Sequence, residues 1–267
     1  MYGLSEKILM GLIVLVFLGG LSFGAYVLIS KRMEDRQFRV NDETNCLVDR
    51  SPPASTAFVV DQSSPFEPRD QERFRTMMRD EIMLLPKHGQ FSLYSIAQNP
   101  AANAPIDSFC SPGATIDWAN ENVNRAIERY ERFLREAEEQ ANNSLATPRG
   151  DVSPLLETFA DIADRVEFDP GIESRRLVVI SDFMQYYGDL DFYREIPDVQ
   201  ALDTRPDRAL EADFSDVCVL FRRVRRPGET HDIAALSRFW ENYFRATGAE
   251  ITWVTRRTHA YCMQAPP

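Results

Sequence analysis

The chain has 267 residues, of which 44% are hydrophobic and 27% are charged, and its formal net charge at pH 7 is −11. This composition is typical of a globular protein rather than a disordered one, and the acidic balance argues against a nucleic-acid-binding protein, whose contact surface is basic. The cysteines show no Cys-x-x-Cys or Cys–His spacing, which argues against a zinc site.

An uncharged apolar run covers residues 8–29 and follows a short tail, residues 1–7. A helix of this length crosses a hydrocarbon core of roughly 30 Å, whereas a cleavable signal peptide has a shorter apolar core and a small-residue exit. We therefore predict a single-pass membrane protein with an uncleaved transmembrane helix. Gly20 and Gly24 form a GxxxG pattern, which permits close packing against the helix of another membrane protein, although glycines are frequent in membrane helices in any case.

The linker comes next, over residues 30–55, which are charged at first and contain Ser-Pro-Pro near their end. The folded domain then covers residues 56–267. Its first apolar run, residues 57–61, lies between turn formers and predicts a buried strand that ends at Asp61. A later run with the sequence LVVISD predicts a second buried strand that ends at Asp182.

Helices and strands alternate along the rest of the domain. Apolar spacing predicts helices over 68–85, 117–142, 153–166 and 233–247, and further strands over 91–96, 106–109, 217–221 and 250–254. The connection between 91–96 and 106–109 is too short for a crossover helix, so these two strands should be antiparallel. The alternation predicts an α/β fold with a doubly wound, mostly parallel, Rossmann-like sheet and one antiparallel edge strand, preceded by the transmembrane helix.

Acids and hydroxyls gather where the predicted strands end. Asp61 and Ser63 follow one strand, Asp182 ends another, and Ser153 stands as the hydroxyl N-cap of a helix that has proline at its first position. Because ligands of open α/β sheets bind at the carboxyl ends of the parallel strands, these side chains should meet. Their oxygens suit Mg²⁺, Mn²⁺ or Ca²⁺. The plainer interpretation is that the two aspartates cap turns and helices through backbone N–H groups.

The order of these features resembles the von Willebrand factor A (VWA) domain over about residues 56–255: a strand followed by D-x-S, an antiparallel hairpin, a helix that opens with Ser-Pro-Leu, and a strand that ends in Asp. The family's metal-ion-dependent adhesion site (MIDAS) reads D-x-S-x-S, then Thr, then Asp. The resemblance assigns Asp61 and Ser63 to the first two positions, Ser153 to the Thr position and Asp182 to the last.

Two positions depart from this pattern. Pro65 stands where the second Ser of the MIDAS would be, and Phe183 follows Asp182 where the family usually has Gly. The resemblance therefore implies a degenerate site that binds a divalent cation weakly, with Ser64 or water in place of the missing ligand.

The function that this resemblance implies is a membrane-anchored protein-interaction or assembly module, which binds a protein partner at the carboxyl edge of the sheet. We expect the partner to contact Asp61, Ser64, Asp182, Phe183, Gln185 and Tyr186. The aromatic residues after Asp182 either pack onto the sheet or form an exposed rim beside this edge. The basic run at 222–227 is interpreted as a solvated strand end.

The alternative function is a membrane-anchored, metal-dependent hydrolase on a Rossmann-like sheet. Such an enzyme needs a general base near the metal, and no histidine follows a predicted strand end. The Gly-rich phosphate loop and the G-x-S-x-G motif are both absent from the sequence. We therefore expect a protein that is not an enzyme.

Two observations disagree about the side of the membrane on which the domain lies. Basic residues follow the apolar run, namely Lys31, Arg32, Arg36 and Arg39, and the positive-inside rule would keep the domain in the cytoplasm. Against this, an antiparallel strand over 106–109 would bring Cys110 to the end of the sheet where the linker enters. Cys46 is close enough in sequence to reach that end.

A Cys46–Cys110 disulfide would stabilise the domain by about 2–4 kcal/mol and would persist in an oxidising compartment. The alternatives are two free thiols in a cytosolic domain, or Cys262 as the mate of Cys46. We favour the extracytoplasmic (periplasmic) side with the Cys46–Cys110 bridge, which leaves Cys218 buried in its strand.

Overall fold

The computed structural model describes residues 19–20, 22–27, 29, 39–41, 43–63, 67–96, 105–113, 122–145, 150, 152–204, 211–226 and 230–254. The chain divides into two units, one made of Met1–Asn41 and Leu47–Arg50 and the other of Asp42–Cys46 and Ser51–Pro267. Most of the predicted transmembrane segment, 8–29, lies outside the described residues. None of the helices formed by the described residues has both the length and the apolarity needed to cross a membrane.

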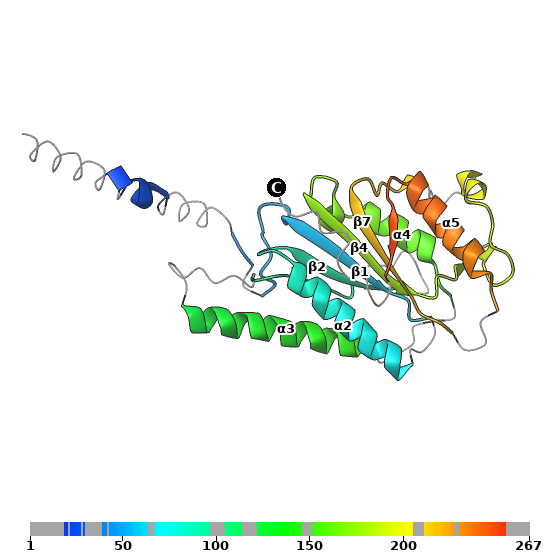
Figure 1. Ribbon diagram of the computed structural model, residues 1–267, viewed down its shortest axis with the longest axis horizontal. Helices are drawn as coiled ribbons and strands as arrows, with labels where there is room; N and C mark the ends of the chain where they lie inside the picture. Colours follow the sequence, from blue (N-terminus) through cyan, green and yellow to red (C-terminus); the bar gives the residue numbers. More distant parts are fainter. Residues whose placement is uncertain are drawn as a thin grey trace, which may run out of the picture. The chain divides into compact units, whose positions relative to one another are not determined.

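A six-stranded sheet forms the centre of the second unit (Figure 1), with the strand order β3-β2-β1-β4-β7-β8. Its strands are β1 (Ala54–Val60), β2 (Gln90–Ser95), β3 (Asp107–Cys110), β4 (Ser174–Ser181), β7 (Val217–Arg223) and β8 (Ile251–Trp253). Only β3 is antiparallel to its neighbour, and the other neighbouring pairs are parallel. The predicted mostly parallel sheet with one antiparallel edge strand is confirmed. A separate two-stranded hairpin consists of β5 (Tyr186–Tyr187) and β6 (Leu190–Asp191).

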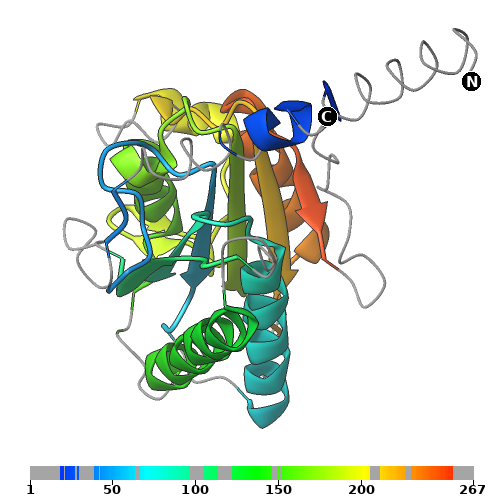
Figure 2. The ribbon, with the colours of Figure 1, turned by 90° about the vertical axis from the view of Figure 1, so that its left-hand side faces the viewer.

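Helices cover both faces of the sheet (Figure 2). One face carries α2 (Pro68–Leu84) and α3 (Val123–Leu145), and the other carries α4 (Leu155–Ala163) and α5 (Ile233–Ala246). Side chains of β1 alternate between these layers, because successive residues of a strand point to opposite faces: Phe58 packs with the α2 and α3 layer, whereas Val59 packs with α4 and α5. All of β1 is therefore buried, which agrees with its continuous apolar run.

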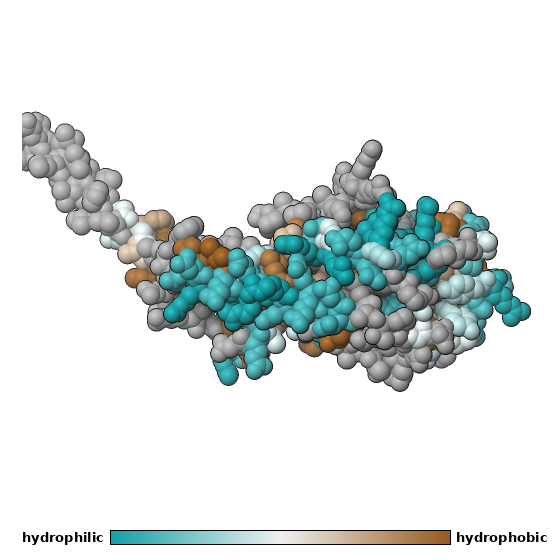
Figure 3. All heavy atoms as spheres, turned by 90° about the horizontal axis from the view of Figure 1, so that it is seen from below, coloured by the Kyte–Doolittle hydropathy of each residue, from teal (hydrophilic) through white to brown (hydrophobic). Residues whose placement is uncertain are grey.

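The outer surface of the α2 and α3 layer is polar. Figure 3 shows that hydrophilic side chains dominate the face over α3, whose charged residues point away from the sheet while Phe133 and Ala137 face the core. Arg79 and Glu138 form an ion pair at 3.3 Å that joins the two helices. This arrangement is that of an amphipathic helix with one buried stripe.

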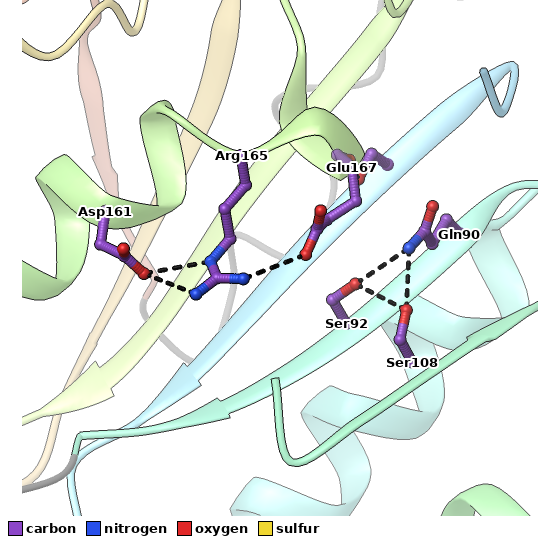
Figure 4. Close-up of polar contacts among 7 residues, drawn as sticks. Gln90, Ser92, Ser108, Asp161, Arg165 and Glu167 are labelled. Carbon is purple, nitrogen blue, oxygen red and sulfur yellow. Dashed lines mark hydrogen bonds and ion pairs between the residues drawn. The ribbon is translucent and has the colours of Figure 1, made fainter. Parts of the chain in front are cut away.

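Polar side chains also make contacts near the start of β1 on the other face of the sheet, which α4 and α5 cover (Figure 4). Arg165 lies between Asp161 and Glu167, with nitrogen–oxygen distances of 2.9 and 3.5 Å. At the sheet edge beside them, β2 and β3 are joined through their side chains. Gln90 Nε2 donates to Ser108 Oγ at 2.8 Å, and the Ser92 and Ser108 hydroxyls are 3.1 Å apart.

The start of α4 differs from the sequence-based prediction. The helix begins at Leu155 and ends at Ala163, and Pro154 occupies the N-cap position without a side-chain hydrogen bond. Ser153 is therefore not the N-cap, because its hydroxyl is engaged elsewhere, as shown below. The 3-10 helix η2 (Val166–Phe168) follows α4 in place of the last predicted turns.

The linker is joined to the sheet by the Cys46–Cys110 disulfide, which confirms that prediction. The backbone supports the bridge, since Cys110 N donates to Thr44 O at 2.8 Å. Because β3 is antiparallel, Cys110 lies opposite Gln90 at the start of β2, the end at which the linker enters. Cys218, which was expected to be buried in its strand, lies in β7 but is only partly buried, and it is also disulfide-bonded. Cys262 lies outside the described residues.

Candidate functional site at the carboxyl edge of the sheet

Asp61 is the centre of the polar cluster at the carboxyl edge. It directly follows β1, its backbone N–H donates to Ile180 O at 2.9 Å, and its side chain is fully buried. Its Oδ2 atom accepts hydrogen bonds from Ser153 Oγ at 3.1 Å and from Ser181 Oγ at 2.6 Å. Its Oδ1 atom accepts from the backbone N–H of Ser63 at 3.0 Å. Three of the predicted site residues therefore meet, and Ser181 joins them.

Ser153 reaches Asp61 through a short antiparallel bridge. Its N–H donates to Tyr186 O at 2.9 Å, and the N–H of Tyr186 donates back to Ser153 O at 3.0 Å. The segment before α4 is thereby attached to the segment that follows β4. This attachment explains why the Ser153 hydroxyl points at the carboxylate instead of capping α4.

Asp182, the fourth predicted residue, lies beside this cluster and is also buried. Its Oδ1 atom accepts from the N–H of Met184 at 3.0 Å, and its Oδ2 atom accepts from Arg226 Nε at 3.1 Å. Burial raises the pKa of Asp182, and the nearby Asp61 carboxylate raises it further, while Met184 N–H and Arg226 act in the opposite direction. The two acids at this edge are therefore close enough for the charge of Asp61 to affect the pKa of Asp182.

Arg226 was missed by sequence reasoning. It lies in the basic run at 222–227, and the interpretation of that run as a solvated strand end is wrong at this position, because the Arg226 side chain is only 16% exposed and pairs with Asp182. The position of the run indicates such a contact, because the run directly follows β7, a parallel strand that ends at the same edge of the sheet as β1 and β4.

The fit of this edge to a divalent cation rests on its free oxygen atoms. In favour of a cation, Ser63 Oγ is buried without a hydrogen-bond partner. Against it, each carboxylate oxygen of Asp61 and Asp182 already accepts a hydrogen bond, one of them from a guanidinium. Within the described ranges no three His, Cys, Asp or Glu side chains gather as a metal site. With Arg226 in this position, the residues do not fit a divalent cation.

Phe183, which follows Asp182, has a backbone conformation that favours glycine. Its φ is 66°, in the left-handed region that costs a non-glycine residue energy. The conformation is supported from several sides: Phe183 N–H donates to Ser181 Oγ at 2.7 Å, and Trp240 Nε1 donates to Phe183 O at 3.0 Å. The ring stacks on Phe221 with a centroid separation of 4.2 Å.

Four of the six predicted partner contacts are interior residues, namely Asp61 and Asp182, described above, together with Phe183 and Gln185. Phe183 is fully buried, and so is Gln185, whose Oε1 accepts from Leu156 N–H at 3.1 Å while its Nε2 donates to Glu157 Oε2 at 2.8 Å. Gln185 accepts a hydrogen bond from a backbone N–H in the first turn of α4. Because its side chain is fully buried, it cannot touch a partner in this conformation. Ser64, another predicted contact, lies outside the described residues.

An aromatic rim remains exposed above these buried groups. Tyr186 and Tyr193 are 42% and 49% exposed, and their rings form an edge-to-face pair at 6.1 Å. The ring of His231 packs on Tyr193 at 5.3 Å. Burial raises the pKa of Tyr193 to about 12, with further contributions from Asp182 and Asp61, so this tyrosine lies within electrostatic reach of both acids. The sequence does not single out His231, because it does not follow a predicted strand end.

The sheet order, the antiparallel edge strand and the polar cluster at the carboxyl edge define a Rossmann-like α/β domain. No family model and no curated protein matches the chain.

Several solved structures are similar at low sequence identity. An aerotolerance-related membrane protein from Bacteroides fragilis, with multiple mutations to serines, is 11% identical over 76% of this chain and 92% of its own, with a TM-score of 0.41. The conserved hypothetical protein BatB from Bacteroides thetaiotaomicron is 13% identical over 75% and 90%, with a TM-score of 0.37. The pilus adhesin SpaC from Lactobacillus rhamnosus GG is 7% identical over 78% of this chain and 28% of its own, with a TM-score of 0.42.

Proposed function

We propose that this chain is a membrane-anchored, VWA-like interaction or assembly module that binds a protein partner at the carboxyl edge of its sheet. The observation that carries the proposal is the exposed pair Tyr186 and Tyr193 beside the buried Asp61 and Asp182 cluster. Exposed tyrosines with restricted rings are common anchors of protein interfaces, because they contribute large contact area at a low cost in side-chain entropy.

The buried cluster supports this rim from below. Ser153 bonds to Asp61 through its side chain and to Tyr186 through its backbone, so the position of Tyr186 depends on the cluster. Asp61 and Asp182 then act as supports of the binding surface, and the partner contacts the rim. A catalytic role has less support, because His231, which packs on Tyr193, has no hydrogen bond to either acid among the described contacts.

We further propose that residues 8–29 anchor the chain in a membrane and that the domain lies on the extracytoplasmic, periplasmic side. The apolar run supports the anchor. The Cys46–Cys110 bridge and the disulfide-bonded Cys218 support an oxidising compartment. Labelling of intact cells with a membrane-impermeant maleimide tests this: we expect Cys46 to react only after reduction, and labelling only after lysis, without reductant, would place the domain inside.

Divalent cations have no part in this proposal. We propose that the chain alone shows no saturable binding of Mg²⁺, Mn²⁺ or Ca²⁺ at Asp61, Ser63, Ser153 and Asp182, because the carboxylate oxygens are engaged.

The test of the proposed function compares partners captured by the full-length chain from solubilised membranes. The double variant Tyr186→Ser/Tyr193→Ser removes the exposed rings while the buried cluster stays intact. The matched control is Val166→Ser, which removes a side chain that is 79% exposed. The next residue, Glu167, accepts a hydrogen bond from Ser55 at the start of β1, so this control lies at the opposite end of the strand from Asp61. We expect a protein that the wild type and the control retain and that the rim variant loses. Equal retention by all three would place the interaction elsewhere.

A further inference from the structure

The carboxyl edge contains two buried acids, and burial of an unpaired carboxylate is unfavourable unless hydrogen bonds or a cation compensate it. Hydrogen bonds from Ser153, Ser181 and Ser63 compensate Asp61. Asp182 has one backbone N–H and the guanidinium of Arg226. Among the residues that the structure describes, Arg226 is the cation that pairs with Asp182.

The position of Arg226 is set by the sheet itself. The N–H of Val224 donates to Ser181 O at 2.8 Å, which extends the pairing of β7 with β4 beyond the last ladder residue. The backbone that carries Arg226 is therefore held beside the residue that precedes Asp182. The resulting Nε–Oδ2 distance of 3.1 Å joins side chains that are 16% and 2% exposed. A pair this well covered is weakly screened by salt.

We propose that the Arg226 guanidinium takes the place of a divalent cation at this edge, so that the Arg226–Asp182 ion pair and a bound divalent cation exclude each other. A cation such as Mg²⁺ needs direct oxygen ligands at about 2.0–2.1 Å. The Asp182 Oδ2 atom that would supply one is held by Arg226. A second positive charge beside the guanidinium would also be repelled in a site with little water.

This inference rests on the proposed function and deepens it, because it says which charge balances Asp182 beneath the tyrosine rim that the partner contacts. A site completed by a metal would lose its partner when a chelator removes the ion. A site with a fixed guanidinium keeps its charge at all relevant pH values, since arginine stays protonated. Partner binding at this edge is then independent of divalent cations.

The experiment uses the full-length chain in detergent and measures thermal unfolding with and without Mn²⁺, together with Mn²⁺ binding by electron paramagnetic resonance. We expect no saturable response from the wild type. Arg226→Gln should unfold at a lower temperature than the wild type and should then gain a site: its Tm should rise by about 5–10 °C when Mn²⁺ reaches about one hundred times its Kd. Arg226→Gln/Asp182→Asn should lose this response. The control Arg245→Gln, which removes an exposed charge on α5, should behave as the wild type.

Two results would overturn the inference. One is saturable Mn²⁺ binding by the wild type that Asp182→Asn removes, because the ion and the ion pair would then coexist. The other is a folded Arg226→Gln variant without a Mn²⁺ response. If that variant unfolds, refolding yield with and without Mn²⁺ replaces Tm: rescue by Mn²⁺ supports the inference and no rescue overturns it. None of these readouts involves a partner, so their failure is separate from failure of the proposed function.

Discussion

Arg176 on β4 and Glu81 on α2 form a bidentate ion pair on the face of the sheet that α2 covers. Arg176 Nε lies 2.9 Å from Glu81 Oε2, and Arg176 Nη2 lies 3.0 Å from Glu81 Oε1. The two side chains are only 12% and 4% exposed. This geometry matches both nitrogen donors to both carboxylate oxygens, so the pair fixes the position of α2 on the sheet as well as contributing energy.

Removal of one partner of this pair leaves the other charge buried. We expect Glu81→Ala to lower the free energy of unfolding by about 3–5 kcal/mol. The matched control is Glu131→Ala, which breaks an exposed pair with Arg135 on α3 and should cost less than about 1 kcal/mol. Chemical denaturation monitored by circular dichroism measures both. Similar losses for the two variants would mean that burial does not decide the strength of the Glu81 pair.

The left-handed backbone of Phe183 predicts that the glycine variant at this position is more stable than the alanine variant, the reverse of the usual order. Loss of the buried ring should destabilise both Phe183→Ala and Phe183→Gly, by about 3–5 kcal/mol for alanine. Glycine adopts positive φ without strain, so we expect Phe183→Gly to be the more stable variant by about 1 kcal/mol. Thermal or denaturant unfolding of the two variants is the measurement.

The control for that order is Phe221, a fully buried neighbour of Phe183 in β7. There the backbone is an ordinary strand, and glycine should be the less stable replacement. If Phe183→Ala is also more stable than Phe183→Gly, the left-handed conformation carries no strain.

The Cys46–Cys110 disulfide closes a long loop, with a sequence separation of 64. We expect Cys46→Ser/Cys110→Ser to lower the free energy of unfolding by about 2–4 kcal/mol, chiefly because the unfolded chain gains freedom. Either single variant should lose about as much as the double variant, since both remove the same bond. Denaturant unfolding without added thiol checks this. Full stability of the double variant would show that the bridge adds nothing to the folded domain.

The sheet could be predicted from the sequence because its signals are local. The continuous apolar runs that became β1 and β4 can be buried only between two helical layers, and the short connection before β3 leaves an antiparallel strand as its only outcome. The approach of Ser153 to Asp61 also followed, since the carboxyl ends of parallel strands share one edge. The topology favoured the Cys46–Cys110 bridge and left Cys262 as a competing mate of Cys46; the structure contains the Cys46–Cys110 bond.

The contacts that could not be predicted depend on loops that cross the edge. Arg226 belongs to a run of arginines in which nothing local distinguishes the residue that pairs with Asp182 from exposed Arg225. Phe183 and Gln185 were expected at the rim. Their inward positions go with the positive φ at Phe183 and with the hydrogen bonds of Gln185 to the start of α4, neither of which leaves a local signal in the sequence. Tyr186 and Tyr193, from the same aromatic segment, are the ones that remain exposed.

The last prediction concerns the ionisation of Tyr193, whose pKa is raised from 10.0 to about 12 by burial and then by Asp182 and Asp61. The folded state therefore favours the neutral phenol, so the stability linked to Tyr193 is complete below pH 10 and is lost as pH rises to about 12. Absorbance titration at alkaline pH measures it: Tyr193→Phe should lack one ionisation near 12, and Asp182→Asn should move that ionisation down. If Tyr193→Phe instead lacks an ionisation at the ordinary tyrosine value, the Tyr193 hydroxyl is neither buried nor close to the two acids.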